Sequence, residues 1–559
     1  MFGTHPIYGK SIYDLSLRPW TANYPPDIPA SFEARVRNGV EMFQIGMTKR
    51  PDGPAIHFFD QTMTHREEDE LAHALASEFM ELGIAPGDRI GLYMQNDPQF
   101  VIALHAAWLV GAIAVTHNPM LKARELNYQI VETGVRLIVC LDSLLATAIE
   151  GAIGTTLSTL ITTSEFTFAG EDAPDLLGPR PEHRPSGAIT LEEIFSRRSG
   201  SRVQPHLADP ADTALLCFTS GTTGPPKAAM LMHMNVAYGE VYLQVGHVSE
   251  DDIVMAGAPM FHVTGITGHL AAARLNAAPM VMFHRFDAGE FLHWLERWRG
   301  TYSILALTAY IAIINHPDLP TRDISSLVKV FTGGAPVSPA MVARFEDVTG
   351  LYMHNTYGMT ETSSPTHMVP PGMRAPIDPN TGAISIGLPV PNVYSAIVGL
   401  ENSELLEPGG LGEIVSMGPD VVAGYWNQKK ESDYALRGGV MHTGDVATMN
   451  EDGWFFLVDR AKDLIVVSGY KVWPRDVEDV LYEHPAVLEA AVVGVPDEYR
   501  GETVKAVVSL RPGFEATTSE DLIAHCSEFL SAYKYPRIVE IVPEVPKTAT
   551  GKILRRELR

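Results

Sequence analysis

A loop rich in hydroxyl groups and glycine, with a lysine at its end, contains the first residues of this chain that could do chemistry. It follows an apolar segment, residues 213–218, that predicts a short buried strand. Backbone N–H groups, hydroxyls and one cation are the donors that a polyphosphate requires. The apolar run after the lysine predicts a helix. The candidate phosphate ligands are Thr219, Ser220, Gly221, Thr222, Thr223, Gly224 and Lys227.

The loop differs from a Walker loop, in which the lysine is followed directly by Ser or Thr, so a P-loop kinase is excluded. Lys227 lies between Pro226 and Ala228, and proline supplies no N–H donor. A short Gly/Thr cluster alone usually marks a surface turn, but the preceding strand and the final lysine favour a binding loop. The string from Leu215 to Lys227 resembles the phosphate-binding signature of the adenylate-forming superfamily, which includes acyl-CoA synthetases, luciferases and nonribosomal adenylation domains.

Further segments match this superfamily in the expected order, over most of the chain after residue 60. Alone, a histidine after a strand is more often a core or surface residue. The resemblance implies that His262, in the segment Pro259–Gly265, borders the acyl pocket and the channel for pantetheine. Relatives that activate α-amino acids carry Asp at this position to hold the ammonium group. Because an imidazole cannot supply that fixed counter-charge, we exclude amino-acid activation.

Two segments are expected to contact the nucleotide. Glycines at the carboxyl end of a strand let a flat ring approach the backbone, and the segment 332–336 follows such a strand. In the segment 355–361 the resemblance implies that Tyr357 stacks on adenine and that Thr360 touches the α-phosphate. Without the neighbouring motifs, either segment would be an ordinary turn. The candidate residues are Gly333, Gly334, Ala335, Pro336, Tyr357, Gly358 and Thr360.

A divalent cation is expected because an anionic carboxylate must attack an already anionic phosphate. Mg²⁺ and cationic side chains lessen that repulsion and stabilise the in-line transition state. The resemblance implies that Glu361 holds the Mg²⁺, with Thr222 as the second candidate ligand. Taken alone, Glu361 could equally be a solvated residue at a helix start.

The remaining matches lie in the last quarter of the chain. The resemblance implies that Asp445 and Arg460 contact the ribose hydroxyls, that Lys462 is a hinge, and that Gly469 lies beside the pantetheine tunnel. A basic tail is usually only solvated, but the match of residues 546–552 makes Lys552 the lysine that enters the site for adenylation. There it would bridge the carboxylate and the α-phosphate.

Length, charge and cysteine usage limit the class of protein. At 559 residues the chain predicts two or more domains. Its net charge of −25 argues against a nucleic-acid binder and is compatible with a cytoplasmic enzyme. The three cysteines are isolated from one another and predict reduced core thiols. We find no secretory signal and no apolar run long enough for a transmembrane segment, so we expect a cytoplasmic protein.

Strands alternate with helices through most of the chain, which predicts an α/β fold with parallel sheets. The pattern includes a helix from residue 67, strands at 89–93 and 137–140, and a helix at 98–111 between them. The proline-rich residues 162–210 predict a linker or surface excursion. Short strands with glycine turns in residues 384–459 predict a small antiparallel β unit.

A second domain is expected after this β unit. The pattern there predicts a helix, two strands and another helix, enough for a small α+β domain. We therefore expect an N-terminal adenylate-forming domain at residues 1–459 that binds the acid and ATP, a hinge at 460–463, and a small mobile domain at 464–559.

These observations predict an ATP-dependent, AMP-forming ligase that activates a carboxylic acid as acyl-adenylate, releases pyrophosphate and transfers the acyl group to CoA. The segments expected near the acyl pocket, 262–268 and 305–310, offer no Arg or Lys to select a second carboxylate, so we expect an apolar acid. A medium- or long-chain fatty acid is favoured over a cyclic or aromatic one. Ile266 stands where some long-chain enzymes place a gating Trp, which weakens the long-chain choice.

Three alternatives remain open from the sequence. An amine could capture the adenylate to form an amide, or a carrier protein could take the acyl group, although the acidic chain does not favour an acidic carrier. A non-catalytic nucleotide-binding protein is disfavoured because every expected catalytic position is filled. The sequence also leaves a homodimer open.

Overall fold

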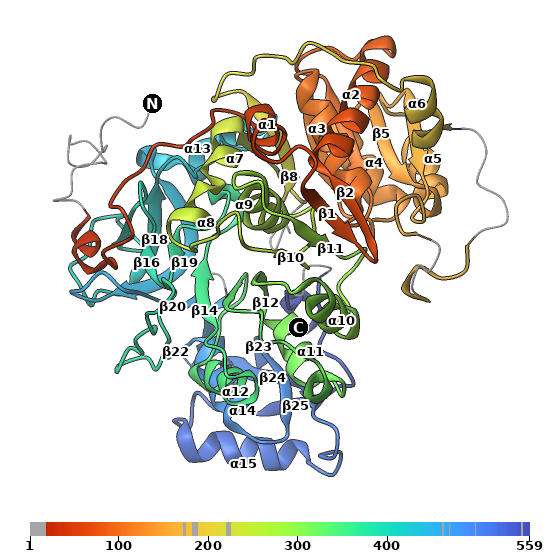
Figure 1. Ribbon diagram of the computed structural model, residues 1–559. Helices are drawn as coiled ribbons and strands as arrows, with labels where there is room; N and C mark the ends of the chain where they lie inside the picture. The colour runs from red at the N-terminus through yellow and green to blue at the C-terminus, as the bar shows by residue number, and fades with distance from the viewer. Residues whose placement is uncertain are drawn as a thin grey trace.

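The computed structural model describes residues 18–170, 175–180, 188–219, 225–460, 463–468, 470–497, 499–548 and 552–559. It confirms the α/β class, with a large N-terminal domain and a small C-terminal domain (Figure 1). Three sheets belong to the large domain and one to the small domain. The exact limits of the domains stay a prediction.

The first sheet has the strand order β7-β6-β5-β3-β4-β8-β9 and is parallel except for β9. Helices α2 and α3 lie beside each other in Figure 1, and α3 is buried along its whole length. The strands are β3 (Arg89–Tyr93), β4 (Ile113–His117), β5 (Leu137–Leu141), β6 (Thr159–Thr163), β7 (Ile189–Thr190), β8 (Thr213–Phe218) and β9 (Ala228–Met232). The helices are α2 (His65–Glu81), α3 (Pro98–Leu109), α4 (Ala123–Thr133), α5 (Leu145–Gly151) and α6 (Leu191–Arg197).

Local sequence explains several of these boundaries. Thr64 and Glu67 form a capping box that starts α2, and Gly134 ends α4 in a left-handed conformation. The indole N–H of the buried Trp108 donates to the carbonyl of Ala214 at 2.9 Å, which joins α3 to β8. The strand that carries the phosphate loop is therefore anchored in the core.

Two expectations for this region were wrong. The apolar run after Lys227 is not a helix but strand β9, which pairs antiparallel with β8 and closes a hairpin around the loop. A run of five apolar residues cannot distinguish a buried strand from a helix, and here the β8 partner decides. The proline-rich residues 162–210 are not simply a linker, because they include β7 and α6 and extend the sheet.

The second sheet has the order β16-β15-β14-β13-β12-β10-β11-β1-β2, with its central strands parallel. These strands are β1 (Pro54–Phe58), β2 (Gln61–Thr64), β10 (Val254–Ala256), β11 (Met280–Met282), β12 (Tyr302–Ala306), β13 (Lys329–Gly333), β14 (His354–Tyr357), β15 (His367–Met368) and β16 (Leu388–Pro389). Its helices are α1 (Gly39–Lys49), α7 (His233–Ala237), α8 (Val241–Gln244), α9 (Ala272–Arg274), α10 (Ala288–Trp298), α11 (Leu307–Ile314) and α12 (Pro339–Thr349), with a π-helical segment at Thr264–Ala271.

The expected small β unit is confirmed as a four-stranded antiparallel sheet. It contains β17 (Tyr394–Val398), β18 (Gly412–Met417), β19 (Met441–Met449) and β20 (Phe455–Arg460), with α13 (Lys429–Ala435) between β18 and β19. The small domain contains β21 (Ile465–Val467), β22 (Tyr470–Val472), α14 (Pro474–Glu483), β23 (Val487–Asp497), β24 (Gly501–Leu510), α15 (Ser519–Phe529) and β25 (Ile538–Ile541). In Figure 1 the small domain, drawn in blue, lies against the large domain with α14 next to α12.

The three cysteines, Cys140, Cys217 and Cys526, are buried and unpaired as expected. None of the helices in the described ranges has the length and apolar character needed to cross a membrane.

Candidate active site

One large cavity lies where the parallel strands of both sheets in the large domain end. Its volume is about 2250 Å³, and its walls include the loops after β3, β4, β8 and β10 to β14, together with the last residues of the small domain. Open α/β sheets bind ligands at the carboxyl ends of their strands. The cavity is large enough for a nucleotide, an acyl group and an acceptor together.

Both ends of the phosphate loop lie on this cavity. The N–H of Thr219 donates to the carbonyl of Lys227 at 2.9 Å, so the β8–β9 hairpin holds the two residues together. The Lys227 ammonium contacts the Glu431 carboxylate and lies 5.1 Å from the centre of the Tyr425 ring. The residues between them that the sequence singled out, Ser220, Gly221, Thr222, Thr223 and Gly224, lie outside the described residues.

The predicted ribose-binding residues form a continuous chain of contacts. Asp445 on β19 lies directly opposite Arg460 on β20, and its carboxylate is 3.0 Å from the guanidinium. The Tyr357 hydroxyl donates to the other carboxylate oxygen at 2.7 Å. Tyr357 and Asp445 are buried at the cavity wall, so the aromatic ring and the carboxylate are fixed relative to each other. The arrangement suits a ligand that carries an aromatic ring next to a pair of vicinal hydroxyls, because the ring can pack on Tyr357 and the hydroxyls can donate to the Asp445 carboxylate.

Glycine is required at Gly333 for a steric reason. A Cβ there would lie 2.7 Å from the Thr356 hydroxyl oxygen and 2.8 Å from the Thr356 carbonyl oxygen. Gly334 has a φ of +83°, in the region that favours glycine. The cavity wall also contains Ala335, Pro336, Gly358 and Thr360. The flat backbone at the ends of β13 and β14 therefore offers a surface for a planar base.

Glu361 lies just after β14 and faces the cavity. Its carboxylate accepts a hydrogen bond from the Tyr425 hydroxyl at 2.7 Å, and its backbone carbonyl accepts one from Val422 at 3.0 Å. One carboxylate next to a phosphate site is a donor set that Mg²⁺ accepts, because this ion keeps waters and phosphate oxygens as its other ligands. The residues present therefore fit the expected cation.

The sequence reasoning missed two side chains that hold these residues. Tyr425 orients Glu361, and Glu413 accepts hydrogen bonds from the Gly444 N–H and the His442 ring, both at 2.8 Å. Glu413 thereby fixes the turn that leads into Asp445. Neither residue stands in a recognisable spacing, so only its contacts reveal it.

His262 and Lys552 meet in the cavity although they belong to different domains. Burial, together with the nearby Lys552 ammonium, lowers the pKa of His262 to about 4. Its Nδ1 accepts a hydrogen bond from the Thr264 N–H at 3.4 Å, as expected for a neutral ring. His262 is therefore a neutral residue of the cavity wall, and the Lys552 ammonium lies near it.

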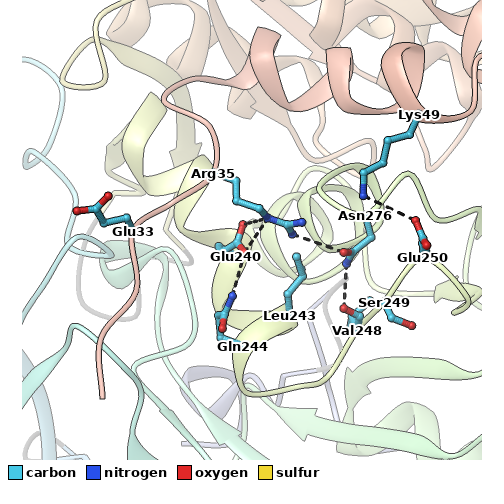
Figure 2. Close-up of a pocket in the computed structure, with 10 residues that line it drawn as sticks. All are labelled: Glu33, Arg35, Lys49, Glu240, Leu243, Gln244, Val248, Ser249, Glu250 and Asn276. Carbon is cyan, nitrogen blue, oxygen red and sulfur yellow. Dashed lines mark hydrogen bonds and ion pairs between the residues drawn. The ribbon is translucent and has the colours of Figure 1, made fainter. Parts of the chain in front are cut away.

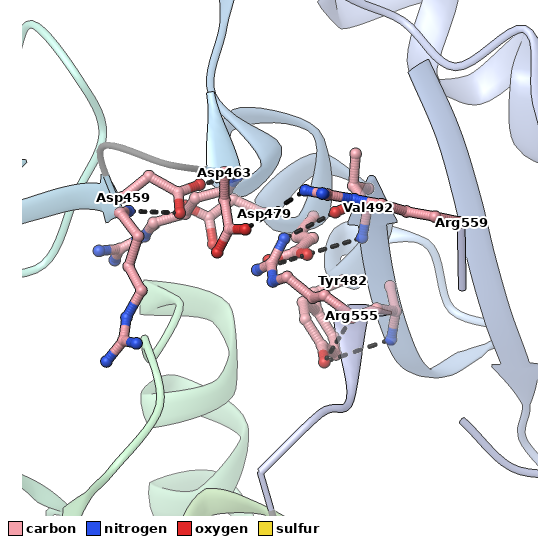
Figure 3. A network of polar contacts seen from close by, with 11 residues as sticks. Asp459, Asp463, Asp479, Tyr482, Val492, Arg555 and Arg559 are labelled. Carbon is pink, nitrogen blue, oxygen red and sulfur yellow. Dashed lines mark hydrogen bonds and ion pairs between the residues drawn. The ribbon is translucent and has the colours of Figure 1, made fainter. Parts of the chain in front are cut away.

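Hydrogen bonds within the tail and to the small domain hold the segment that carries Lys552. The Lys552 N–H donates to the Thr548 hydroxyl at 3.1 Å, and the Thr548 N–H donates to the Lys552 carbonyl at 2.7 Å. Arg555 extends from the tail to Val492 (Figure 3), and its guanidinium donates to the Val492 carbonyl at 2.6 Å. The same guanidinium lies 2.9 Å from the Glu478 carboxylate. Arg559 lies 3.5 Å from Asp463. The tail is thus attached to β23, to α14 and to the segment after β20.

The predicted hinge Lys462 and the predicted tunnel residue Gly469 lie outside the described residues. Their described neighbours show which face of the small domain is turned inward. Arg460 and Asp463 line the cavity. Lys552 lines the cavity as well, and Ser468 and Tyr470 do not.

A second, smaller cavity of about 400 Å³ carries no recognisable site (Figure 2). Four of its charged side chains form two pairs: Arg35 lies 2.9 Å from Glu240, and Lys49 lies 3.7 Å from Glu250. The chemistry is therefore concentrated in the large cavity.

The fold and the cavity together define a two-domain α/β protein whose large cavity is lined by residues of both domains. Comparison with known proteins identifies the family. The family model "AMP-binding enzyme" matches residues 43–426, and "AMP-binding enzyme C-terminal domain" matches residues 476–552. The chain therefore belongs to the AMP-binding enzyme family, and it is an ATP-dependent, AMP-forming acid–thiol ligase.

Individual relatives cover nearly the whole chain. The long-chain-fatty-acid–CoA ligase of Bacillus subtilis (strain 168) is 35% identical over 97% of this chain and 98% of its own. The crystal structure of the anthranilate CoA ligase AuaEII with anthranoyl-AMP has a TM-score of 0.82 and 26% identity, covering 95% of this chain and 98% of its own. The amide bond synthetase McbA from Marinactinospora thermotolerans has a TM-score of 0.77 and 26% identity, covering 93% and 99%.

Proposed function

We propose that the enzyme activates a fatty acid with a predominantly apolar chain and passes the acyl group to CoA. The observation that carries this proposal is that His262 and Lys552 lie near each other in one cavity. The part of the cavity wall that would contact the acyl chain is apolar. That wall includes Leu305, Ala306 and Ala309 at the end of β12 and on α11. The Bacillus relative, named as a long-chain-fatty-acid–CoA ligase, supports the choice of acid.

In the first half-reaction the substrate carboxylate attacks the α-phosphate of ATP and pyrophosphate leaves. Lys552 bridges the two reacting groups and offsets the repulsion between them. Tyr357 packs against the base, while Asp445 and Arg460 hold the ribose hydroxyls. Thr360 and the loop from Thr219 to Lys227 position the phosphates.

Mg²⁺ belongs to this proposal because the Glu361 carboxylate faces the phosphate site. Glu361 and Thr222 would hold the ion, and the ion would neutralise charge on the phosphates. The Tyr425 hydroxyl donates to the Glu361 carboxylate at 2.7 Å and so orients it at the cavity wall.

For the second half-reaction we propose that the small domain turns about Lys462. This movement withdraws Lys552 and brings Gly469 to the site, where the absence of a side chain leaves room for the CoA thiol. The thiol sulfur then attacks the acyl carbon, and AMP leaves. A cytoplasmic location and a homodimer stay predictions.

An amine is the second acceptor that a specific observation favours, since an amide bond synthetase has the same fold. A product screen by mass spectrometry separates the two acceptors. The enzyme is supplied with ATP, Mg²⁺, a panel of apolar acids, CoA and a mixture of amines. Acyl-CoA and AMP as the dominant products would support the proposal. Amides formed while CoA stays unused would identify an amine as the acceptor in place of CoA. The absence of AMP with every acid would contradict the adenylation chemistry.

A further inference from the structure

A histidine lies on the cavity wall in a segment to which the sequence motifs assign no role. His284 follows β11 by two residues and lines the same cavity as the nucleotide residues. Its Nδ1 lies 2.7 Å from a carboxylate oxygen of Asp97, so the carboxylate accepts the Nδ1 proton. The imidazole keeps 11% of its surface exposed, while Asp97 is fully buried. The buried carboxylate thus fixes the orientation of a ring whose remaining edge is open to the cavity.

The local fold does not explain why a buried aspartate occupies position 97. Asp97 precedes α3 at the capping position, but its side chain makes no capping hydrogen bond. Its second carboxylate oxygen, Oδ2, is buried and has no hydrogen-bond partner within the described residues. A buried carboxylate is costly unless it is paired, and its partner here is His284.

The surroundings of His284 are polar, unlike the acyl wall near α11. Gln95, Asn96 and Arg285 line the cavity beside it. The N–H of Asn96 donates to the His284 carbonyl at 3.1 Å, and its side chain donates to the Ala258 carbonyl at 2.9 Å. Hydrogen bonds therefore join the ends of β3, β10 and β11 into one polar corner of the cavity.

The strand order gives the distance of this corner from the nucleotide. Strands β12 and β10 stand between β13 and β11. Three strand spacings correspond to about 14 Å along the edge of the sheet. An acyl chain that starts beside the β13 loop and follows this edge passes Leu305 and Gly257, both of which line the cavity, before it meets His284. Because an extended alkyl chain zigzags, it advances about 1.25 Å per carbon, so that distance fits a chain of roughly twelve carbons.

We propose that His284, held by Asp97, is a specificity-determining residue that hydrogen-bonds a second oxygen function on the acyl chain, so that the preferred substrate is an oxygenated fatty acid. Hydroxyl, oxo and carboxylate groups share the acceptor oxygen that an imidazole N–H requires. This inference rests on the proposed function and deepens it, because the chain between the two ends of the acid stays apolar.

The charges around His284 favour the donor form of its ring. Burial alone would lower its pKa, but the Asp97 carboxylate and Glu165 offset burial and the opposing Arg285, so that the pKa of His284 is raised. A protonated ring donates from Nε2 as well as from Nδ1. The preference for an oxygenated acid should therefore decline as pH rises through this pKa.

The test compares decanoic and dodecanoic acids with their ω-hydroxy, ω-oxo and ω-carboxy derivatives, by kcat/KM for AMP formation at several pH values. For wild type we expect at least one oxygenated acid to exceed its parent by about tenfold or more, since a site built around a polar group rejects the analogue that lacks it. The neutral and the anionic derivatives distinguish a hydroxyl or oxo partner from a carboxylate. If no acid gives AMP, the proposed function fails. If all acids react and the parents are equal or better, this inference alone fails.

Three variants separate substrate recognition by His284 from a structural role. We expect His284→Phe to bring the ratio of oxygenated to parent acid close to one, with the KM for ATP unchanged. His284→Gln keeps an N–H donor and should retain part of the ratio without its pH dependence. Asp97→Asn should move the decline of the ratio to lower pH. A His284→Phe enzyme that keeps the wild-type ratio, or that loses activity equally on every acid, would overturn the proposal.

Discussion

The Arg475 guanidinium donates to the backbone carbonyl of Val337 at 2.9 Å, and this hydrogen bond joins the small domain to the large one. Arg475 lies in the first turn of α14, and Val337 lies in the loop after β13 that borders the nucleotide site. The same guanidinium donates to the Leu457 carbonyl on β20. Arg475 is 3% exposed, so solvent does not screen these bonds.

We predict that Arg475→Met slows adenylation by roughly tenfold, because hydrogen bonds from a charged donor contribute about 1.5–3 kcal/mol. The small domain would then hold Lys552 in the cavity less often. Hydrolysis or thiolysis of supplied acyl-adenylate should change little, and measuring the two half-reactions separately checks this. Arg374→Met, which removes an exposed partner of Glu346, is the matched control and should alter neither rate. Equal losses in both half-reactions would argue for a general folding role instead.

Lys552→Ala should reduce adenylation by a factor on the order of a hundred or more, because it removes the cation that stabilises the developing charge. Thiolysis of supplied acyl-adenylate should survive. Pyrophosphate exchange and single-turnover thiolysis measure the two steps. Lys505→Ala removes a lysine of the same domain that pairs with Glu540 on the neighbouring strand, and it should affect neither step. Loss of both steps in Lys552→Ala would contradict the assigned division of roles.

Tyr357→Phe and Asp445→Asn should both raise the KM for ATP, with the larger effect for Asp445→Asn. The first change removes one hydrogen bond of 2.7 Å to the carboxylate, which corresponds to about 1 kcal/mol or roughly a fivefold effect. The second also leaves the Arg460 guanidinium without its charged partner. Steady-state kinetics with varied ATP check the order, and a KM for the acid that rises instead would place these residues elsewhere.

Asp420→Asn should stabilise the protein at neutral pH. Burial raises the pKa of Asp420 to about 8, and the nearby N–H groups of Asp420 and Val421 offset only part of this effect. The folded state therefore keeps a proton that the unfolded state loses above about pH 4. The wild-type contribution is thus lost progressively as pH rises from about 4 to 8, and the variant should remove that decline. Thermal melts at mildly acid and neutral pH test this: an equal change in Tm at both would contradict it.

The sequence by itself determined several local elements and most of the candidate site residues. The capping box at Thr64 and Glu67 and the apolar strand before Thr219 are encoded by neighbours a few residues apart. The string around the phosphate loop and the resemblance it carries predicted the adenylating class, which the family match confirms. These features are local because capping, turn formation and strand burial depend on short-range contacts.

Only the tertiary structure decided which distant residues meet. Tyr357 and Asp445 are 88 residues apart and join only because the end of β14 and the first half of β19 line the same cavity. Docking of the small domain brings Lys552 near His262, and the packing of the two large sheets against each other brings Asp97 to His284, 187 residues away. Likewise the run after Lys227 became a strand because β8 offers it a partner. Sheet order and domain docking arise from long-range packing, and no spacing within a single segment encodes them.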